Sequence, residues 1–561
     1  MVKIMKIMKK SIRQITAVIF CGIILAGCAD NGNNITSGNN NGKSDIQKVQ
    51  STENDKEVQK DKNNENMGEK DKKQNEKQLK RAHYNMSLEL ITNDSIEKKE
   101  GLTEPFVLKG TCEIEFVNYS EDTWNQVCLR DYSTAMYPAE TIKEFAGTDI
   151  EKKMMMSAVK EVKDGDNKLQ YTVNNKDKTI VMIDLKNPVE PGATGKICVE
   201  FEELVACGSS RMSYNIFSSD RSNITVSLGP FYPVMPVYVN HKWATDRYFD
   251  DGECFYTKCA DYDVRIKVPD EYKVISTGSE KNDDGTWTLK AENVRDFAII
   301  TGNRYEKKSI EVDDVTVNVW YPAGKDEYKK WADKMTGVAS NAVKIFDNYF
   351  GKYPYDSLDV VAAVYEYGGM EYPQMVRIAD VDAYMSNENE ELNSCMNVVH
   401  EIAHEWFYAV VGNDQYNEAW LDEGFARYCE ILYKEESGMD KKIIDEEIKM
   451  RKRNYEETLF YPVTSNESQL GEKTKKNGEV VFISYDTVIY DGGAMFLLDL
   501  RNTMGKEKFQ KFMKDWYSTN MFKEVTSKDF TDKLYEYDNS SKISDIVKKY
   551  TSKKDDLYLH H

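Results

Sequence analysis

Two histidines four residues apart are the clearest chemical signal in the sequence. Residues 400 to 404 read HEIAH, and His400 and His404 are two of only six histidines among 561 residues. On an α-helix, side chains four residues apart lie above one another, so both imidazoles can face one metal ion. Glu401 lies about 100° around the same helix, close enough to reach a water molecule on the ion without being a ligand. The pattern indicates a catalytic metal site with a general base.

A third ligand is expected, because a catalytic zinc site commonly has three protein ligands, and two histidines with one carboxylate are a familiar set. Glu423, in the segment WLDEGFA, follows His404 with 18 residues between them. That interval lets one helix end near VGNDQYN, the chain turn, and a second helix begin at EAWLDEGFARYCEILYKEE. We therefore expect His400, His404 and Glu423 to hold one Zn²⁺ per chain. Without the HEIAH motif, Glu423 would be interpreted as a solvated helix residue.

The HEIAH motif lies within a segment of helical periodicity. The stretch ELNSCMNVVHEIAHEWFYAVVG has no proline or interior glycine, and Met396, Val399, Ala403, Phe407 and Val410 recur at three- and four-residue steps. The spacing predicts a buried amphipathic helix that continues to about residue 412.

HEIAH followed by the glutamate of WLDEGFA resembles the aminopeptidase N family of gluzincin zinc peptidases, which includes leukotriene hydrolase. The upstream segment EYGGMEYPQM is similar to the Gly-x-Met-Glu-Asn motif of that family at Gly368, Met370 and Glu371. The downstream segment SYDTVIYDGGAMFLLDL resembles the helix whose tyrosine assists the reaction, which places that role on Tyr490. The resemblance extends over about residues 310 to 540.

The resemblance implies a zinc-dependent hydrolysis of peptides. Zinc would activate a water molecule, Glu401 would take its proton, and Tyr490 would donate to the developing oxyanion. Glu371 would pair with the free α-ammonium of the substrate, which makes the enzyme an aminopeptidase. The backbone of Gly368, Gly369 and Met370 would bind the peptide as an added strand.

Two departures from the family pattern stand out. Tyr372, followed by Pro373, replaces the asparagine expected after Glu371, which affects the geometry of amine recognition. The sequence also stops near the end of the expected catalytic domain, without the long helical C-terminal domain of larger relatives.

Three functions compete on these residues. The first is an aminopeptidase that trims peptides at the cell surface. The second is a zinc endopeptidase or another hydrolase on the same scaffold. The third is a zinc-containing, peptide-binding lipoprotein without turnover. Glu401 and Tyr490 argue against the third, because a structural zinc site needs neither residue.

The N-terminus predicts export. MVKIMKIMKKSIRQ is basic and ITAVIFCGIILAGC is a short apolar run, so residues 1–27 are predicted to be a signal peptide. LAGC resembles a bacterial lipobox, which implies cleavage before Cys28 and its lipidation; a plain secretory signal is the alternative. Residues 28–81 are polar and predict a disordered tether. We expect a lipid-anchored protein on the extracellular face of the bacterial cell membrane.

The remaining elements predict an α+β multidomain protein. From 82 to 306, β-type runs such as MSLELI, GTCEIEFVN and GKICVEFEEL alternate with turn clusters, so we expect an all-β domain. From 307 to 561 we expect a thermolysin-like, mostly helical zinc-peptidase domain. It begins with strands in IEVDDVTVNVWYP, a helix over about 325 to 350 and a strand in SLDVVAAVY, with helices from there to the end.

The charge and the cysteine content limit the binding partners and metal ligands that the sequence predicts. The net charge of −20 argues against nucleic acid and indicates a solvated acidic surface. Peptide substrates and, through the lipid, a membrane are the expected partners. Of the eight cysteines from Cys112 to Cys429, Cys254 and Cys259 are a candidate disulfide, and free buried cysteines are the alternative. Because no CxxC spacing occurs, no cysteine is assigned to a metal.

Overall fold

The computed structural model describes residues 81–92, 106–137, 142–143, 146–216, 223–249, 252–379, 388–458, 461–475, 477–552 and 558–559. The predicted signal peptide, Cys28 and all of the predicted tether except Arg81 lie outside the described residues. Residues Leu79–His561 form one compact unit. Within the described ranges, no helix is both long enough and apolar enough to cross a membrane.

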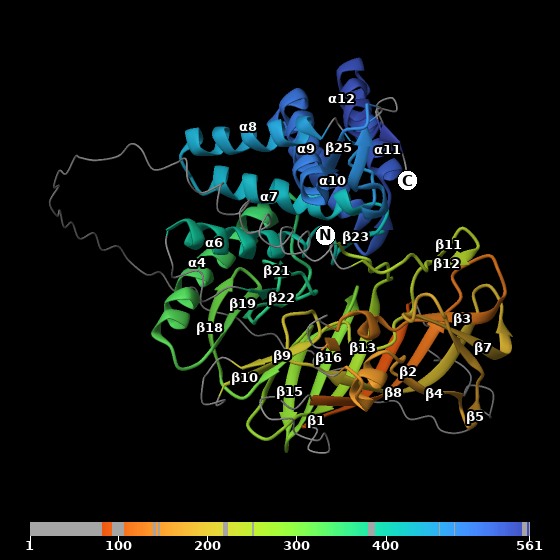
Figure 1. The fold of residues 1–561 in the computed structure, drawn as a ribbon. Coiled ribbons are helices and arrows are strands. Elements are labelled where there is room, and N and C mark those ends of the chain that lie inside the picture. Colours follow the sequence, from red (N-terminus) through yellow and green to blue (C-terminus); the bar gives the residue numbers. More distant parts are fainter. Residues whose placement is uncertain are drawn as a thin grey trace, which may run out of the picture. The chain divides into compact units, whose positions relative to one another are not determined.

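An eight-stranded sheet, in the order β15-β16-β13-β1-β2-β8-β4-β5, is the largest element of the N-terminal part (Figure 1). Its strands are β1 (His83–Thr92), β2 (Phe106–Val117), β4 (Val159–Asp164), β5 (Asn167–Lys168), β8 (Thr194–Val205), β13 (Ala260–Lys267), β15 (Ser279–Asp283) and β16 (Thr286–Val294). Side chains along β1 alternate between buried and exposed, because one face of the sheet packs on a core. β1 pairs antiparallel with β2 and parallel with β13.

Smaller sheets complete the β-rich part. One has the order β3-β7-β6, another has the order β14-β17-β10-β9, and β11 pairs with β12. Their bounds are β3 (Trp124–Arg130), β6 (Tyr171–Val173), β7 (Ile180–Val189), β9 (Ser213–Ile216), β10 (Ile224–Leu228), β11 (Tyr238–Val239), β12 (Lys242–Trp243), β14 (Lys273–Ser276) and β17 (Ile299–Gly302). Met86, Ile114, Val127 and Val199 are fully buried in the shared core. The short helical segments η2 (Tyr132–Ala135) and α3 (Asp149–Met154) interrupt the predicted all-β pattern.

The second part begins with a five-stranded sheet in the order β18-β19-β20-β22-β21. Its strands are β18 (Tyr305–Val312), β19 (Val315–Pro322), β20 (Ser357–Ala362), β21 (Gly369–Met370) and β22 (Met375–Ile378). Helix α4 (Asp326–Tyr349) contacts β18 and β19, and α6 (Glu388–Ala403) contacts β21, β22 and α4 (Figure 1). The sheet therefore supports the helix that contains His400 and ends just before His404.

Helices dominate the rest of the chain and gather together in Figure 1. They are η3 (Ala419–Leu421), α7 (Glu423–Glu436), α8 (Lys441–Glu457), η4 (Glu467–Gln469), η5 (Thr487–Asp491), α9 (Gly492–Met504), α10 (Lys506–Asn520), α11 (Ser527–Tyr537) and α12 (Ser541–Thr551). Trp406, Trp420 and Trp516 are at most 1% exposed and fix their packing. The fold class predicted from the sequence is therefore confirmed.

After the predicted strand SLDVVAAVY, the sequence interpretation missed β21 and β22 of the five-stranded sheet and five further short strands. The five further strands are β23 (Val411–Asn413), β24 (Gly471–Lys475), β25 (Val480–Ile483), β26 (Lys523–Val525) and β27 (Tyr558–Leu559), which form two small sheets. The predicted run of helices to the end of the chain is wrong there. Runs this short contain too few residues to show an alternating pattern.

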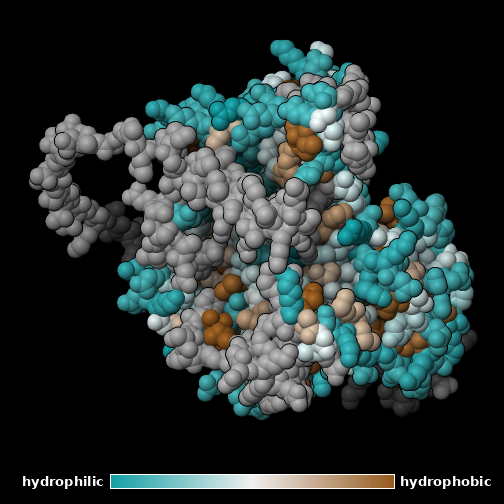
Figure 2. All heavy atoms as spheres, in the orientation of Figure 1, coloured by the Kyte–Doolittle hydropathy of each residue, from teal (hydrophilic) through white to brown (hydrophobic). Residues whose placement is uncertain are grey.

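Among the described residues, the eight cysteines from Cys112 to Cys429 form no disulfide with one another. The candidate disulfide between Cys254 and Cys259 is therefore wrong. On the face shown in Figure 2, hydrophilic residues cover most of the described surface, and apolar residues appear in small separate groups.

Candidate active site

Helix α6 brings His400 and His404 together at its C-terminal end. Their ring centroids lie 4.8 Å apart with an angle of 75° between the rings. The Nε2 atoms of His400 and His404 lie 3.0 Å and 3.4 Å from one oxygen, Oε2 of Glu423. The structure therefore brings the three predicted ligands to one point.

The helix ends earlier than predicted. Regular helix stops at Ala403, whereas the periodicity predicted a helix to about residue 412. Tyr408 has a φ of 131°, a conformation that non-glycine residues rarely adopt, and its carbonyl accepts a hydrogen bond of 2.8 Å from Nε of Arg295. This fully buried arginine from the β-rich part thus fixes the turn after His404. The residues of this turn are buried and mostly apolar, so the apolar periodicity continues past the end of the helix. This is why the sequence predicted a helix that is too long.

Close packing of two helices positions Glu423 at the start of α7. A Cβ atom on Gly424 would lie 2.8 Å from Cα of Gly493 on α9, so glycine at both positions lets the helices approach. Glu423 is 5% exposed. Burial alone would raise the pKa of its carboxyl, but the facing imidazoles of His404 and His400 hold this pKa well below its usual range.

The outer nitrogens of both histidines face carboxylates. Nδ1 of His400 lies 2.9 Å from Oε1 of Glu430, and Nδ1 of His404 lies 2.6 Å from Oδ1 of Asp422. Because a neutral imidazole donates from one nitrogen only, these partners place the proton on Nδ1 and leave Nε2 free to bind a metal. Burial opposes protonation, but the carboxylates raise the pKa of both histidines above its usual value.

The donor set fits a zinc ion. One ligand atom from each of His400, His404 and Glu423 lies within 4.8 Å of the others, and all three residues are buried. Two imidazoles and a carboxylate are ligands that zinc accepts, and the carboxylates behind the histidines are the usual outer partners of such ligands. The residues present therefore suit the metal expected from the sequence.

Glu401 lies against the strand that precedes Glu371. It is 6% exposed, and a Cβ atom on Gly369 would lie 2.4 Å from its carboxylate. Glycine at this position therefore lets β21 approach the helix. Burial raises the pKa of Glu401 to about 7, with the two histidines opposing the rise. A carboxyl group with this pKa can both accept and return a proton near neutral pH.

The segment from Gly368 to Glu371 lies along the same helix. A Cβ atom on Gly368 would lie 2.9 Å from the side chain of Asn397 on α6, and Met370 is 2% exposed. Glu371 is 4% exposed, and its Oε1 accepts a hydrogen bond of 3.4 Å from Nε2 of Gln415. Burial raises the pKa of Glu371 well above its usual range, and the charge of Glu253 adds to the rise.

Tyr372 packs in an apolar group beside this cluster. It is 3% exposed and belongs to a group with Met370 and Met375, and a Cβ atom on Gly229 would lie 2.5 Å from its hydroxyl oxygen. Among the described residues, the hydroxyl has no hydrogen-bond partner. Tyr372 therefore fills a contact with the β-rich part, and the departure from the family motif at this position leaves Glu371 in place.

Tyr490 reaches the site from η5, a π-helical turn. Its hydroxyl donates to Oε1 of Glu423 at 2.6 Å, and its ring stacks on His400 with centroids 5.8 Å apart. π-Helical turns are rare and often occur at functional sites. The tyrosine therefore lies beside the ligand cluster, where the sequence predicted it.

Glu253 was missed by the sequence interpretation. This residue of the β-rich part forms an ion pair with the buried Arg211, while its Oε2 has no hydrogen-bond partner among the described residues. Burial raises the pKa of Glu253 to about 7, with Arg211 opposing the rise and Glu423 adding to it. No local motif marks Glu253, so only the fold reveals it. Glu430 could have been found, because it lies two helical turns after Glu423.

Two histidines and one glutamate thus meet at the centre of the site, with Glu401 and Tyr490 beside them. Residues 335–550 match the family model described as the Peptidase family M1 domain. Over these residues the chain is similar to a peptidase family M1 domain.

The chain is also similar to curated aminopeptidases over part of their length. The chain is 25% identical over 375 residues to the glutamyl aminopeptidase of Sus scrofa, which covers 61% of this chain and 38% of the relative. It is 24% identical over 295 residues to the alanine/arginine aminopeptidase of Saccharomyces cerevisiae, covering 50% of this chain and 32% of the relative. The chain thus spans less than two fifths of either relative.

Solved structures share the fold over most of the chain. An M1 zinc metallopeptidase from Deinococcus radiodurans superposes with a TM-score of 0.55 at 16% identity, covering 84% of this chain and 93% of that one. A mutant of a two-domain M1 zinc metallopeptidase bound to L-arginine has a TM-score of 0.55 at 16% identity, covering 85% and 96%. At these identities the likeness shows the fold.

Proposed function

We propose that this protein is a zinc aminopeptidase that removes N-terminal residues from peptides. The observation that supports it most is the convergence of His400, His404 and Glu423 beside Glu401 and Tyr490, with the buried Glu371 facing the same space. A structural metal site would need neither a buried general base nor a tyrosine on its glutamate ligand.

The chain's own groups divide the reaction among them. His400, His404 and Glu423 would hold the ion. When bound, zinc supplies a Lewis acid that lowers the pKa of water and polarises the scissile carbonyl. Glu401 takes the proton of the attacking water and delivers it to the leaving nitrogen. Tyr490 donates its phenolic hydrogen to the oxygen that gains negative charge.

Two buried carboxylates suit a substrate with a free amine. Glu371 and Glu253 each have a raised pKa, and the charge of Glu253 contributes to that of Glu371. An α-ammonium group placed between them gives each carboxylate a charged hydrogen-bond donor, which is among the stronger polar contacts. Oε2 of Glu253 offers an acceptor for it. This pair of carboxylates favours an exopeptidase that recognises the free N-terminus and cleaves the bond next to it.

Mass spectrometry of the products tests the proposal. The zinc-loaded protein is incubated with a short peptide whose C-terminus is amidated, and samples are taken over time. An aminopeptidase produces a ladder in which each product lacks one more N-terminal residue. Internal fragments without such a ladder would contradict the proposal and favour an endopeptidase.

We further propose that the enzyme acts at the extracellular face of the cell membrane, anchored by lipid on Cys28. The basic leader, the apolar run and LAGC in the sequence support this location. Peptides outside the cell are then the substrates.

A further inference from the structure

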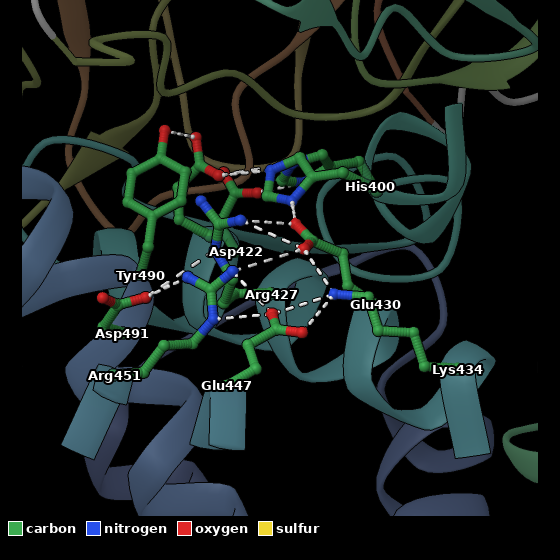
Figure 3. A network of polar contacts seen from close by, with 11 residues as sticks. His400, Asp422, Arg427, Glu430, Lys434, Glu447, Arg451, Tyr490 and Asp491 are labelled. Carbon is green, nitrogen blue, oxygen red and sulfur yellow. Dashed lines mark hydrogen bonds and ion pairs between the residues drawn. The ribbon is translucent and has the colours of Figure 1, made fainter. Parts of the chain in front are cut away.

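A network of buried and half-buried charged side chains lies behind the metal ligands (Figure 3). It joins α7, α8 and the π-helical turn η5, and it balances three cations against three carboxylates. Its members are Arg427, Glu430, Lys434, Glu447, Arg451 and Asp491. None of these residues has a role in the proposed reaction, yet Glu430, Lys434 and Asp491 are buried and removing charges from water is costly.

One end of the network fixes His400. Glu430 is 3% exposed, and its Oε1 lies 2.9 Å from Nδ1 of His400. The same carboxylate accepts hydrogen bonds of 2.8 Å and 3.1 Å from Nη1 of Arg427. The orientation of the His400 ring therefore depends on where the network holds Glu430.

The other end fixes the turn that bears Tyr490. Asp491, the next residue, lies 2.6 Å from Nη1 of Arg451. The guanidinium carbon of Arg427 lies 5.4 Å from the centre of the Tyr490 ring. Two arginines thus contact the segment whose tyrosine donates to Glu423, and Figure 3 shows Arg427 and Arg451 between Asp491 and Glu430.

Arg451 connects the two ends. Its Nε and Nη2 donate to Oε1 of Glu447 at 2.9 Å and 2.8 Å, while Nη1 reaches Asp491. Nη2 also lies 3.9 Å from Oε2 of Glu430. Only the planar, forked guanidinium group can contact carboxylates in these directions at once, which a lysine ammonium group cannot do.

We infer that Arg451 is a positioning residue for the proposed hydrolysis. Through Glu430 it fixes the position of His400, and through Asp491 it fixes the position of Tyr490. These two side chains both contact Glu423. The effect on turnover rests on the proposed function, whereas the effect on metal affinity does not. Loss of Arg451 should therefore weaken zinc binding and slow the chemical step together, while substrate binding changes little.

The test compares Arg451→Met with Arg501→Met. Arg501 is a matched control, because this buried arginine of α9 also binds a carboxylate of α7 through two contacts, Glu435 at 2.7 Å and 2.8 Å. Among the described residues, Arg501 forms no hydrogen bond or ion pair with Glu430 or Asp491. Zinc dissociation constants are measured by competition with a chelator, and kcat and KM are measured separately at saturating zinc. Unfolding temperatures of both variants are recorded.

For Arg451→Met we expect zinc affinity to fall about 10- to 100-fold, the range for outer partners of metal ligands. We also expect kcat to fall at least about tenfold with KM within twofold, and Arg451→Lys to recover part of each loss. Arg501→Met should keep the wild-type zinc affinity and kcat below its unfolding temperature. Wild-type zinc affinity and kcat in Arg451→Met, or equal losses in Arg501→Met, would overturn the inference.

If Arg451→Met does not fold, Asp491→Asn decides the test. It weakens the ion pair between Asp491 and Arg451 by removing the charge of Asp491, with little change in side-chain shape. It should lower kcat and zinc affinity in the same direction, and wild-type values for both would overturn the inference. Should the wild-type protein hydrolyse no peptide, zinc affinity alone decides. A loss in Arg451→Met but not in Arg501→Met supports the positioning role, and equal affinities contradict it.

Discussion

Tyr490 and Glu423 share a hydrogen bond of 2.6 Å, in which the phenolic hydroxyl donates to Oε1 while Oε2 of the same carboxylate faces both histidines. The tyrosine is therefore tied to the ligand set through one side chain. A substrate oxygen that approaches the ion would meet the same hydroxyl. This arrangement links ligand geometry to stabilisation of the transition state.

Tyr490→Phe removes that donor and keeps the ring that stacks on His400. We expect kcat to fall by about 10² to 10³, the usual effect of losing one oxyanion donor. KM and a zinc content near one ion per chain should persist. Steady-state kinetics with metal analysis measure both, and a kcat within about threefold of wild type would show that another group donates.

Glu401→Gln tests the general base. The amide keeps the size of the side chain but cannot accept the proton, so turnover should fall by about 10² to 10⁴. The three ligands remain, and zinc should stay bound at the wild-type level. Activity close to wild type would mean that a different residue takes the proton from water.

His404→Ala tests the ligand set directly. Two remaining ligands hold zinc poorly, so we expect the purified variant to lose most of its metal and its activity. Elemental analysis after dialysis against a weak chelator gives the answer. A variant that retains one zinc ion per chain would contradict the assignment of His404.

Tyr372 should matter for stability rather than for chemistry. Tyr372→Phe removes a buried hydroxyl without a partner, so the free energy of unfolding should stay equal or rise. Tyr372→Asn leaves a cavity and should lose about 3 kcal/mol, within the range for truncating a buried aromatic residue. Denaturant unfolding measures both. A stable Tyr372→Asn protein with altered preference for free amines would place Tyr372 in substrate recognition instead.

Cys28→Ser tests the anchor. Without the thiol, lipid cannot attach, so the protein should leave the membrane fraction or remain as the uncleaved precursor. Cell fractionation followed by mass determination distinguishes these results. A cleaved protein that stays with the membrane would rule out a lipid on Cys28.

The ligand set was predictable because its signal is local. His400 and His404 lie one helical turn apart, and Glu423 follows in a second helix, so a short stretch of sequence defines all three. The burial alternation of β1 and the helical periodicity of α4 are likewise visible within single stretches of sequence. Such patterns suffice for the fold class and for the centre of the site.

Other features depend on contacts between distant segments. The end of α6 at Ala403 depends on Arg295, whose hydrogen bond holds Tyr408 in an unusual conformation. Glu253 reaches the site through the fold alone. Arg451 lies on an ordinary charged helix in the sequence, and its importance emerges only beside Asp491 and Glu430. No spacing rule connects these residues, so sequence patterns could not reveal them.

Cleavage of a free peptide and of its N-acetylated copy, by wild type and by Glu371→Ala, tests the aminopeptidase assignment most directly. Acetylation removes the charge that Glu371 would bind and leaves a buried carboxylate without its partner. We predict that wild type strongly prefers the free peptide. Glu371→Ala should lose roughly 2 to 4 kcal/mol of that preference, a thirty- to thousandfold change in the ratio of kcat/KM values. Equal cleavage of both peptides by wild type would contradict the account.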